Sequence, residues 1–350
     1  MIANRMKSLT PYVPGEQPQD GKYIKLNTNE NPYPPAPAIS KFLKEMDITN
    51  LKLYPEPTSV KLRTAIAEAE GLKPDNVFAG NGSDEVLSFI FYAFFDADFG
   101  PVLFPEFTYS FYPVYSAFYN IPFTKVSLKD DFSINIEDYL NRKTTGMIIP
   151  NPNAPTGVYL PINEIRRLLE RFPSDRLVAI DEAYIAFGGE SAAGLINEFD
   201  NLLVIRTFSK SSSLAGIRLG YALGNEKLIQ ALTTAKDSFN SYPVDYITQK
   251  CGELAVKDAE YGNDIAERII ATRKRFVAAA SALGWEILPS MANFVFAKKP
   301  GRSGEEIYTR LKKQKILVRF FNKPGISDFV RITIGTDEEM ETLLSAIKTF

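Results

Sequence analysis

The sequence predicts an α/β protein with a mostly parallel central β-sheet covered by helices on both faces, plus a smaller α+β domain. From about residue 46 to 225, short apolar runs rich in β-branched residues alternate with amphipathic runs of helical spacing. Strands buried on both faces of a parallel sheet have this pattern. After the last long helical run the alternation gives way to a sparser mixture of strands and helices. With 350 residues, 45% of them hydrophobic, the chain is long enough for a large core and a second, smaller one.

The predicted elements follow in order along the chain. Strands, each followed by a polar loop, are expected in residues 76–80, 100–109, 145–152, 176–184 and 201–210. Helices with apolar positions three and four apart are expected at 60–72, 83–95, 162–172 and 244–284, the last with a break near Gly262. A strand–helix–strand–helix tail completes the chain from 292 onward.

This order divides the chain into three parts. Residues 1–45, rich in Pro, Asn and Gly, are expected to form an ordered arm that contributes to the small domain and the active site. Residues 46–255 are expected to form the large α/β domain, and residues 256–350 the small α+β domain.

Composition excludes several function classes. The chain has no histidine, which removes Ser-His-Asp and Cys-His hydrolases and histidine-ligated metal sites. A net charge of −2 gives no sign of a nucleic-acid partner. The single cysteine, Cys251, cannot form an internal disulfide, and the N-terminus lacks the apolar core of a signal peptide. We expect a soluble cytoplasmic protein without a membrane or nucleic-acid partner, whose proton chemistry uses Lys, Tyr, Asp, Glu or an organic cofactor.

Chemistry-bearing residues follow almost every predicted strand. In open α/β sheets, ligands bind beyond the carboxyl ends of the strands, so these residues are expected along one rim. Taken singly, each has an ordinary explanation: a helix cap, a turn, a core ring or a solvated lysine. Their joint occurrence is much harder to explain in that way. They are Ser83, Asp84, Phe107, Asn153, Asp181, Tyr184, Thr207, Ser209, Lys210 and Arg218.

Together these groups suit pyridoxal 5′-phosphate. The cofactor needs a lysine amine for its aldehyde and a carboxylate for its ring nitrogen. It also needs hydroxyl or amide donors for its ring oxygen and an aromatic ring against its face. Its phosphate needs hydroxyls, an arginine and the free amides of a helix N-terminus. Lys210 is the expected amine, with Thr207, Ser209 and Arg218 as phosphate ligands.

The chain resembles the fold-type-I pyridoxal-phosphate-dependent aminotransferases over nearly its whole length. Any one of the matching motifs is weak evidence, but their order along the chain is very specific. They are LTPYVPGEQP (9–18), KLNTNENPYPP (25–35), LYPEP (53–57), GNGSDE (80–85), PNPNAPTG (150–157), DEAY (181–184), RTFSKSSSLAGIRLGY (206–221), ANFVFA (292–297), ILVRFF (316–321) and VRITIGT (330–336).

The resemblance implies roles for the rim residues. Lys210 carries the cofactor and moves the substrate Cα proton, Asp181 pairs with the ring nitrogen, and Tyr184 pairs with the ring oxygen. Phe107 stacks on the ring. The amides of Ser83 and Asp84 join Thr207, Ser209 and Arg218 in holding the phosphate.

The resemblance also implies residues beyond the rim. Tyr54 reaches the phosphate in the neighbouring subunit, which implies a homodimer with shared sites. The substrate pocket is implied to be lined by Tyr12, Asn293, Arg319 and Arg331. On the residues alone, Arg331 lies on the strand face opposite Val330 and Ile332, where it either faces solvent or captures a carboxylate or phosphate.

One position departs from the family pattern. The asparagine that usually precedes Pro-Thr-Gly, and whose amide meets the ring oxygen, is Ala154 here, with Asn153 one residue earlier. Either Asn153 reaches the site through a shifted loop, or Tyr184 makes that contact together with water.

Within the family, the chain resembles the branch that transfers the amino group of histidinol phosphate to 2-oxoglutarate. Two alternatives share the fold: an aromatic amino-acid aminotransferase and an O-phosphothreonine decarboxylase. A non-catalytic regulatory module that binds the cofactor is disfavoured, because the chain has neither the spare length nor the basic patch for an appended DNA-binding segment.

Overall fold

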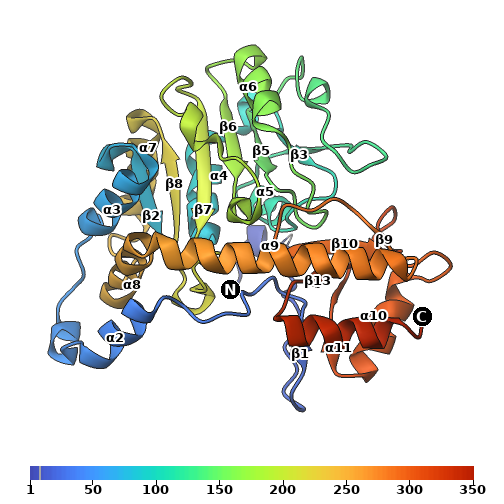
Figure 1. Ribbon diagram of the computed structural model, residues 1–350. Helices are drawn as coiled ribbons and strands as arrows, with labels where there is room; N and C mark the ends of the chain where they lie inside the picture. Colours follow the sequence, from blue (N-terminus) through green and yellow to red (C-terminus); the bar gives the residue numbers. More distant parts are fainter. Residues whose placement is uncertain (8) are drawn as a thin grey trace.

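The fold is built around a seven-stranded sheet, as the computed structural model shows for residues 1–7 and 9–350 (Figure 1). Strand β8 runs antiparallel to both of its neighbours, and the other ladders of the sheet are parallel. The mostly parallel sheet expected from the sequence is therefore confirmed. In spatial order the strands are β2 (Val77–Gly80), β8 (Gly220–Gly224), β7 (Leu202–Thr207), β6 (Leu177–Asp181), β5 (Gly146–Pro150), β3 (Val102–Pro105) and β4 (Phe123–Val126).

Both faces of this sheet are buried, because successive side chains of each strand enter different cores. Val178 and Ile180 of β6 belong to one core, whereas Ala179 belongs to the other. The first core is shared with α3 (Val60–Glu70), α6 (Ile162–Arg171) and α8 (Tyr246–Lys257). The second is shared with α4 (Gly82–Phe94), α5 (Tyr112–Phe118) and α7 (Glu226–Phe239).

A second, antiparallel sheet lies in the C-terminal part of the chain and has a core of its own. Helix α9 (Ala259–Ala282) runs beneath the large sheet toward this part, as Figure 1 shows. The sheet order is β12 (Arg319–Phe320), β13 (Phe329–Thr333), β10 (Phe294–Lys298) and β9 (Glu286–Ile287). Two helices complete this part: α10 (Gly304–Lys313) and α11 (Asp337–Ile347).

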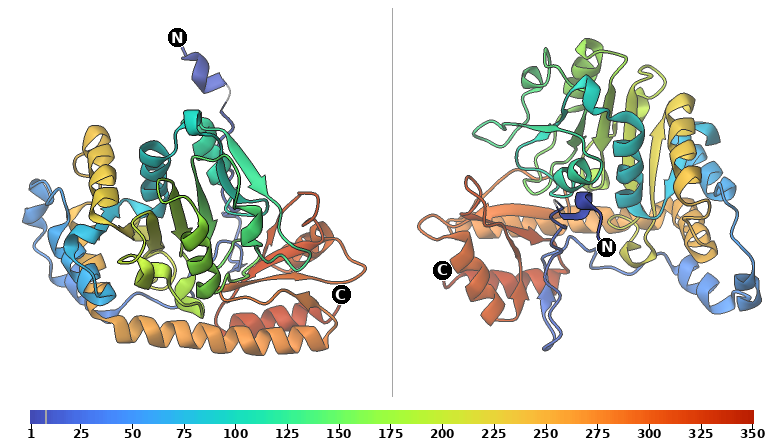
Figure 2. Two further views of the ribbon diagram at one scale, coloured as in Figure 1. Left: turned by 90° about the horizontal axis from the view of Figure 1, so that it is seen from above. Right: turned by 180° about the vertical axis from the view of Figure 1, so that it is seen from behind.

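The N-terminal arm is attached to the C-terminal part. Strand β1 (Ile24–Lys25) pairs in parallel with β11 (Ile316–Leu317), and Glu16 accepts hydrogen bonds from Lys312 and Tyr308. Helix α1 (Asn4–Lys7) projects away from the rest of the chain (Figure 2), and α2 (Pro37–Glu45) leads toward the large sheet. The division at residues 45 and 255 stays a prediction, which the separate cores and the arm contacts support.

Several details differ from the sequence-based expectation. The break expected in the long helical stretch is present, but it lies at Asp258, between α8 and α9, and Gly262 lies inside α9. A helix-interior glycine costs only about 1 kcal/mol, which packing of the long helix offsets. Strands β4 and β8 are short and were not anticipated, nor was α7.

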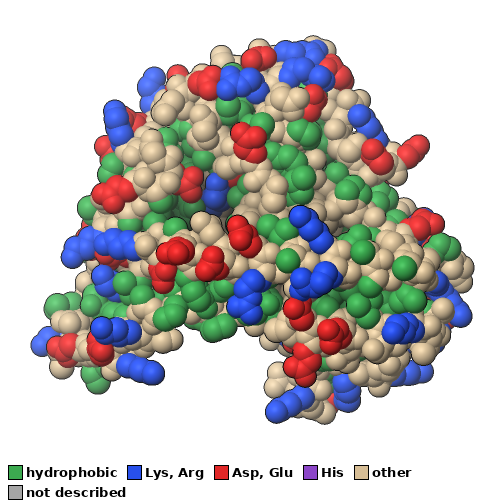
Figure 3. Space-filling view, viewed as in Figure 1, with side chains coloured by type: hydrophobic (Ala, Val, Ile, Leu, Met, Phe, Trp, Pro, Cys, Tyr) green, Lys and Arg blue, Asp and Glu red, His purple; other side chains and the backbone are tan. Residues whose placement is uncertain are grey.

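The face of the molecule drawn in Figure 3 carries no dominant charge of either sign. Acidic and basic side chains are interspersed over the face drawn in Figure 3, in keeping with the net charge of −2. The outline of this face is notched below α9, between α2 and the C-terminal part. In the described part of the chain, no helix is long and apolar enough to cross a membrane.

Gly220 brings the antiparallel strand into contact with the start of α4. A Cβ atom at this position would lie 2.3 Å from the Ser83 nitrogen and 2.6 Å from the Gly82 carbonyl carbon. Both obstacles are backbone atoms and cannot rotate away. A side chain at residue 220 would therefore separate β8 from the helix N-terminus.

We predict that Gly220→Ala lowers the free energy of unfolding by about 1–3 kcal/mol, the usual cost of overpacking a closed site. Gly194→Ala is the matched control, because a Cβ there meets nothing within 4 Å. Urea unfolding of both variants measures the difference. Equal midpoints for the two variants would contradict the close approach.

Candidate active site

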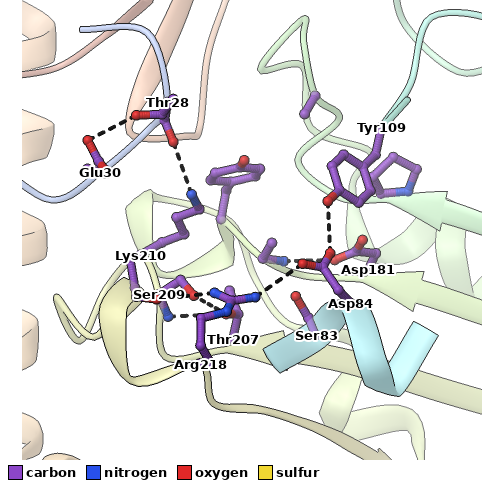
Figure 4. Close-up of a pocket in the computed structure, with 15 residues that line it drawn as sticks. Thr28, Glu30, Ser83, Asp84, Tyr109, Asp181, Thr207, Ser209, Lys210 and Arg218 are labelled. Atoms are coloured by element: carbon purple, nitrogen blue, oxygen red, sulfur yellow. Dashed lines mark hydrogen bonds and ion pairs between the residues drawn. The ribbon is translucent and has the colours of Figure 1, made fainter. Parts of the chain in front are cut away.

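A cavity of about 200 Å³ lies beyond the carboxyl ends of β5, β6 and β7, beside the start of α4 (Figure 4). We call it the rim cavity. The structure brings together most of the residues that the sequence placed on this rim. Those that line the cavity are Ser83, Asp84, Asp181, Tyr184, Thr207, Ser209, Lys210 and Arg218.

Lys210 projects into the rim cavity from the loop that follows β7. Its Nζ donates a hydrogen bond to the Thr28 carbonyl oxygen at 3.2 Å, as Figure 4 shows. Burial, together with the positive charge of Arg331, lowers the pKa of Lys210 to about 8. Near neutral pH, an amine with this pKa is unprotonated in part of the protein molecules. The unprotonated amine can act as a nucleophile and as a base.

Asp181 closes the opposite side of the cavity at the end of β6. Its carboxylate accepts hydrogen bonds from the Tyr112 hydroxyl at 2.7 Å and from the Ala183 amide at 3.2 Å. Burial raises the pKa of Asp181 to about 6, although both hydrogen bonds favour the ionised form. A buried carboxylate without a basic partner among the described residues suits a cationic ligand group.

The neighbouring carboxylate, Glu182, has a different environment because it points to the other side of β6. It accepts hydrogen bonds from Arg206 Nε at 2.8 Å, from the Ser191 hydroxyl and from the Ala192 amide. This buried ion pair ties β6 to β7. Of the two acids in Asp-Glu-Ala-Tyr, only Asp181 faces the cavity.

Hydroxyls, a guanidinium and a helix N-terminus line one end of the cavity. The Thr207 hydroxyl donates to the Ser209 hydroxyl at 3.0 Å, and both side chains are buried. Arg218 reaches the same place from the loop before β8, where its Nη2 lies 3.1 Å from Asp84 Oδ2. The first amides of α4, at Ser83 and Asp84, have no partner within the helix. Such a set of donors binds an anion.

A second cavity, which we call the arm cavity, adjoins the first. The two share Thr28, Tyr109, Ala154, Tyr184 and Lys210 as lining residues. The predicted substrate residues that line the arm cavity are Tyr12, Arg319 and Arg331.

Arg319 and Arg331 are directly opposite each other in the β12–β13 ladder. Like charges in this arrangement are unfavourable, so the pair indicates a role in binding anions. In the described residues neither arginine has an acidic partner. Their guanidinium groups donate to the carbonyl oxygens of Val13, Pro14 and Asn27 instead. Arg331 Nε and the Thr108 hydroxyl are buried without a hydrogen-bond partner in the described chain.

Four predicted residues do not contribute side chains to either cavity. Phe107 packs beside Phe132, whereas Tyr109, from the same loop, lines both cavities. The structure therefore does not place Phe107 where it could stack on a bound ring, and Tyr109, two residues later, is the residue of this loop that could do so. The length of this loop could not be read from the sequence.

Asn153 is also turned away from the cavities. Its amide donates to the Phe107 carbonyl oxygen at 2.8 Å and to the Thr156 hydroxyl at 3.1 Å, while Ala154 lines both cavities. The shifted-loop alternative is therefore not seen.

Asn293 is fully buried, and its Nδ2 donates to the Asn29 carbonyl oxygen at 3.0 Å. It supports the arm instead of lining the predicted substrate pocket. The fourth residue, Tyr54, is 83% exposed and stacks on Tyr242 with ring centroids 4.8 Å apart, outside both cavities.

Sequence reasoning missed several residues around the site. Tyr109 donates to Asp84 at 2.8 Å, and Tyr112 donates to Asp181. Thr28 and Glu30 of the arm line the rim cavity beside Lys210. The run of aromatic residues after β3 was a usable signal for the tyrosines. Nothing local to the arm indicates which of its polar residues face Lys210.

The residues present fit pyridoxal 5′-phosphate. One cavity holds an amine of lowered pKa, a buried carboxylate, a tyrosine hydroxyl, an aromatic ring and a set of anion ligands at a helix N-terminus. Lys210 would bind the aldehyde, Asp181 the ring nitrogen and Tyr184 the ring oxygen. Thr207, Ser209 and Arg218 would hold the phosphate with the start of α4.

Comparisons with known proteins agree with this chemistry. The family model described as aminotransferase class I and II matches residues 21–347. The histidinol-phosphate aminotransferase of Syntrophus aciditrophicus (strain SB) is 55% identical over 99% of this chain and 97% of its own. That of Marinomonas sp. (strain MWYL1) is 50% identical over 99% and 98%. The structure of the Sinorhizobium meliloti enzyme, in complex with pyridoxal-5′-phosphate, aligns with a TM-score of 0.90 at 26% identity, over 99% of this chain and 96% of that chain.

Asp181 is predicted to destabilise the cofactor-free protein when it is ionised. Because its pKa is raised in the folded state, stability falls as the pH rises from about 4 to about 6, by up to about 3 kcal/mol. Asp181→Asn removes this cost and can still accept from the Ala183 amide. We expect the variant to match the parent at pH 4 and to exceed it at pH 8 in urea unfolding.

Glu182→Gln is the contrasting control. It removes the closer ionic partner of the buried Arg206 and leaves only Glu70, at 3.7 Å, so it should lower stability at pH 8. An Asp181→Asn protein less stable than the parent at both pH values would contradict the argument.

Proposed function

The chain belongs to the class I and II aminotransferases, and from this premise we propose that it transfers the amino group of histidinol phosphate to 2-oxoglutarate. The products are imidazole acetol phosphate and glutamate, which places the reaction in histidine biosynthesis. One observation carries the proposal: a single cavity holds Lys210, Asp181 and a complete set of anion ligands. The curated relatives named for this reaction, at 50% and 55% identity, support the choice of substrate.

Pyridoxal 5′-phosphate supplies a protonated ring that accepts electrons when a proton leaves the substrate Cα. Asp181, ionised above about pH 6, keeps the ring nitrogen protonated by its charge. Lys210 Nζ, with a pKa of about 8, accepts the Cα proton and can return it. Thr28 and Glu30 of the arm line the cavity beside Lys210.

The arm cavity supplies substrate recognition in this proposal. The two substrates are anions of different shape, a phosphate monoester and a dicarboxylate. Arg319 and Arg331 present forked donors that fit either group. The Phe321 ring lies 5.6 Å from each guanidinium carbon and limits where the two groups can turn. Tyr12 stacks on Phe111 at the edge of the same cavity and offers an aromatic surface for the imidazole ring.

We also propose that the protein is a homodimer and that it is located in the cytoplasm. Tyr54 is exposed beside two further exposed apolar side chains, Leu53 and Tyr242. A homodimer would cover this group and would bring Tyr54 to the partner's phosphate site. A cytoplasmic location agrees with the free, buried thiol of Cys251.

Single-turnover absorbance tests the substrate. Protein reconstituted with pyridoxal phosphate is mixed with histidinol phosphate, with phenylalanine or with O-phosphothreonine. We expect rapid conversion of the bound cofactor to its amino form with histidinol phosphate, slow or no conversion with phenylalanine, and no carbon dioxide from O-phosphothreonine.

Lys210→Ala is expected to abolish turnover while Lys227→Ala, an exposed control, keeps it. Comparable conversion with phenylalanine would indicate a broader aromatic aminotransferase, and carbon dioxide release would indicate the decarboxylase. Transaminase activity retained by Lys210→Ala would overturn the assignment of the amine.

Shared sites in a homodimer predict complementation between an inactive and an impaired variant. Lys210→Ala and Tyr54→Ala homodimers are expected to be inactive and strongly impaired, respectively. In a hybrid, the site that keeps its own lysine receives an intact Tyr54 from the other subunit. Mixing the variants with subunit exchange should therefore restore one active site in each hybrid dimer.

Activity of the mixture no higher than the mean of the two homodimers would contradict a contribution of Tyr54 across the interface. Gel filtration of the mixture confirms that hybrids have formed.

A further inference from the structure

The Tyr184 hydroxyl has a partner that belongs to neither the sheet nor the loops around it. Asn29 of the arm donates a hydrogen bond from Nδ2 to the Tyr184 oxygen at 2.9 Å. Burial raises the pKa of Tyr184, so the hydroxyl keeps its own proton. With one lone pair engaged by Asn29, that proton is free to point into the cavities that Tyr184 lines.

Asn29 is held rigidly for this contact. It is 1% exposed and has a left-handed backbone with φ of 56°. Its backbone amide donates to the Thr333 hydroxyl at 3.0 Å, and its Oδ1 accepts from the same hydroxyl at 3.2 Å. Its carbonyl oxygen accepts from Asn293 at 3.0 Å. Since Oδ1 faces a hydroxyl donor, the side-chain nitrogen must face Tyr184.

The same region lacks the donor that the loop before Gly157 could have supplied. Ala154 has no polar side chain, and the Asn153 amide is used by the Phe107 carbonyl oxygen and Thr156. Tyr184 is therefore the side-chain donor available there for the ring oxygen of a bound pyridoxal phosphate. Without a second donor, the hydrogen bond to the ring oxygen depends on the direction in which the Tyr184 hydroxyl proton points.

We propose that Asn29 is a positioning residue that orients the Tyr184 hydroxyl proton toward the ring oxygen of the cofactor. The inference rests on the proposed function. It assigns Asn293 and Thr333 the task of holding Asn29, and it links the C-terminal part, through the arm, to the electronic state of the cofactor. Asn29 acts only through Tyr184 and does not need to touch the reacting atoms.

The proposal predicts a spectroscopic effect. A donor to the ring oxygen stabilises its anionic form, so losing the donor raises the pH at which the visible band of the bound cofactor titrates. Asn29→Gly removes the amide but keeps the left-handed backbone without strain. We expect the midpoint of this titration to rise by about 0.5–1 pH unit and the affinity for the cofactor to fall about three- to tenfold.

Asn120→Gly is the matched control, because Asn120 is an exposed asparagine with the same φ of 56°, outside both cavities. It should leave the titration midpoint and the cofactor affinity unchanged. A purely structural role for Asn29 predicts a lower thermal midpoint of unfolding with an unchanged titration.

A double-mutant cycle with Tyr184→Phe shows whether Asn29 changes the titration midpoint through the Tyr184 hydroxyl. Tyr184→Phe alone should raise the midpoint, and adding Asn29→Gly should raise it no further. Asn29→Asp, which keeps the shape and the Oδ1 acceptor, provides a second cycle if the glycine variant does not fold. Its added charge acts in both backgrounds and cancels in the comparison.

Two outcomes would overturn the inference alone: a wild-type midpoint in Asn29→Gly, or a shift of equal size with and without the Tyr184 hydroxyl. Wild-type protein that failed to bind pyridoxal phosphate would overturn the proposed function, and this inference with it. The binding measurement on the parent protein therefore separates the two failures.

Discussion

The parallel pairing of β6 with β7 is the constraint on which the site depends. The ladder sets Asp181 opposite Ile205, so the carboxylate ends one strand where the next continues toward Thr207, Ser209 and Lys210. The antiparallel return of β8 sets Gly220 opposite Thr207 and brings Arg218 to the same edge. A shift of one residue in either ladder would turn these side chains to the other face of the sheet.

Burial at this edge gives the residues their chemistry. The same low-dielectric surroundings raise the pKa of Asp181 and lower that of Lys210. Both groups are costly to the protein alone and become useful when a ligand with a cationic nitrogen and an aldehyde is bound. Glu182, one residue away, is equally buried but is neutralised by Arg206, so it serves the fold. Because successive side chains point to opposite faces of the sheet, Asp181 faces the ligand cavity while Glu182 forms an ion pair on the other side.

The mostly parallel sheet and most residues of its rim could be predicted from the sequence, because each strand is short, apolar and followed by its functional residues. The rim positions of Lys210, Asp181, Tyr184 and Arg218 depend only on chain order and on the rule that ligands bind beyond strand ends. Phe107, Asn153 and Asn293 were misplaced because loop conformation and packing between distant segments decide where their side chains point. The role of Asn29 depends on a contact with a residue 155 positions away, and no local pattern encodes such a contact.

The measurement that tests the central claim most directly is chemical attachment of the cofactor to the chain. The protein is loaded with pyridoxal phosphate and treated with borohydride, and its proteolytic peptides are identified by mass spectrometry. The account predicts that the added mass is found on Lys210, in the segment that follows β7. Attachment at another lysine, or none at all after loading, would contradict the identification of the site.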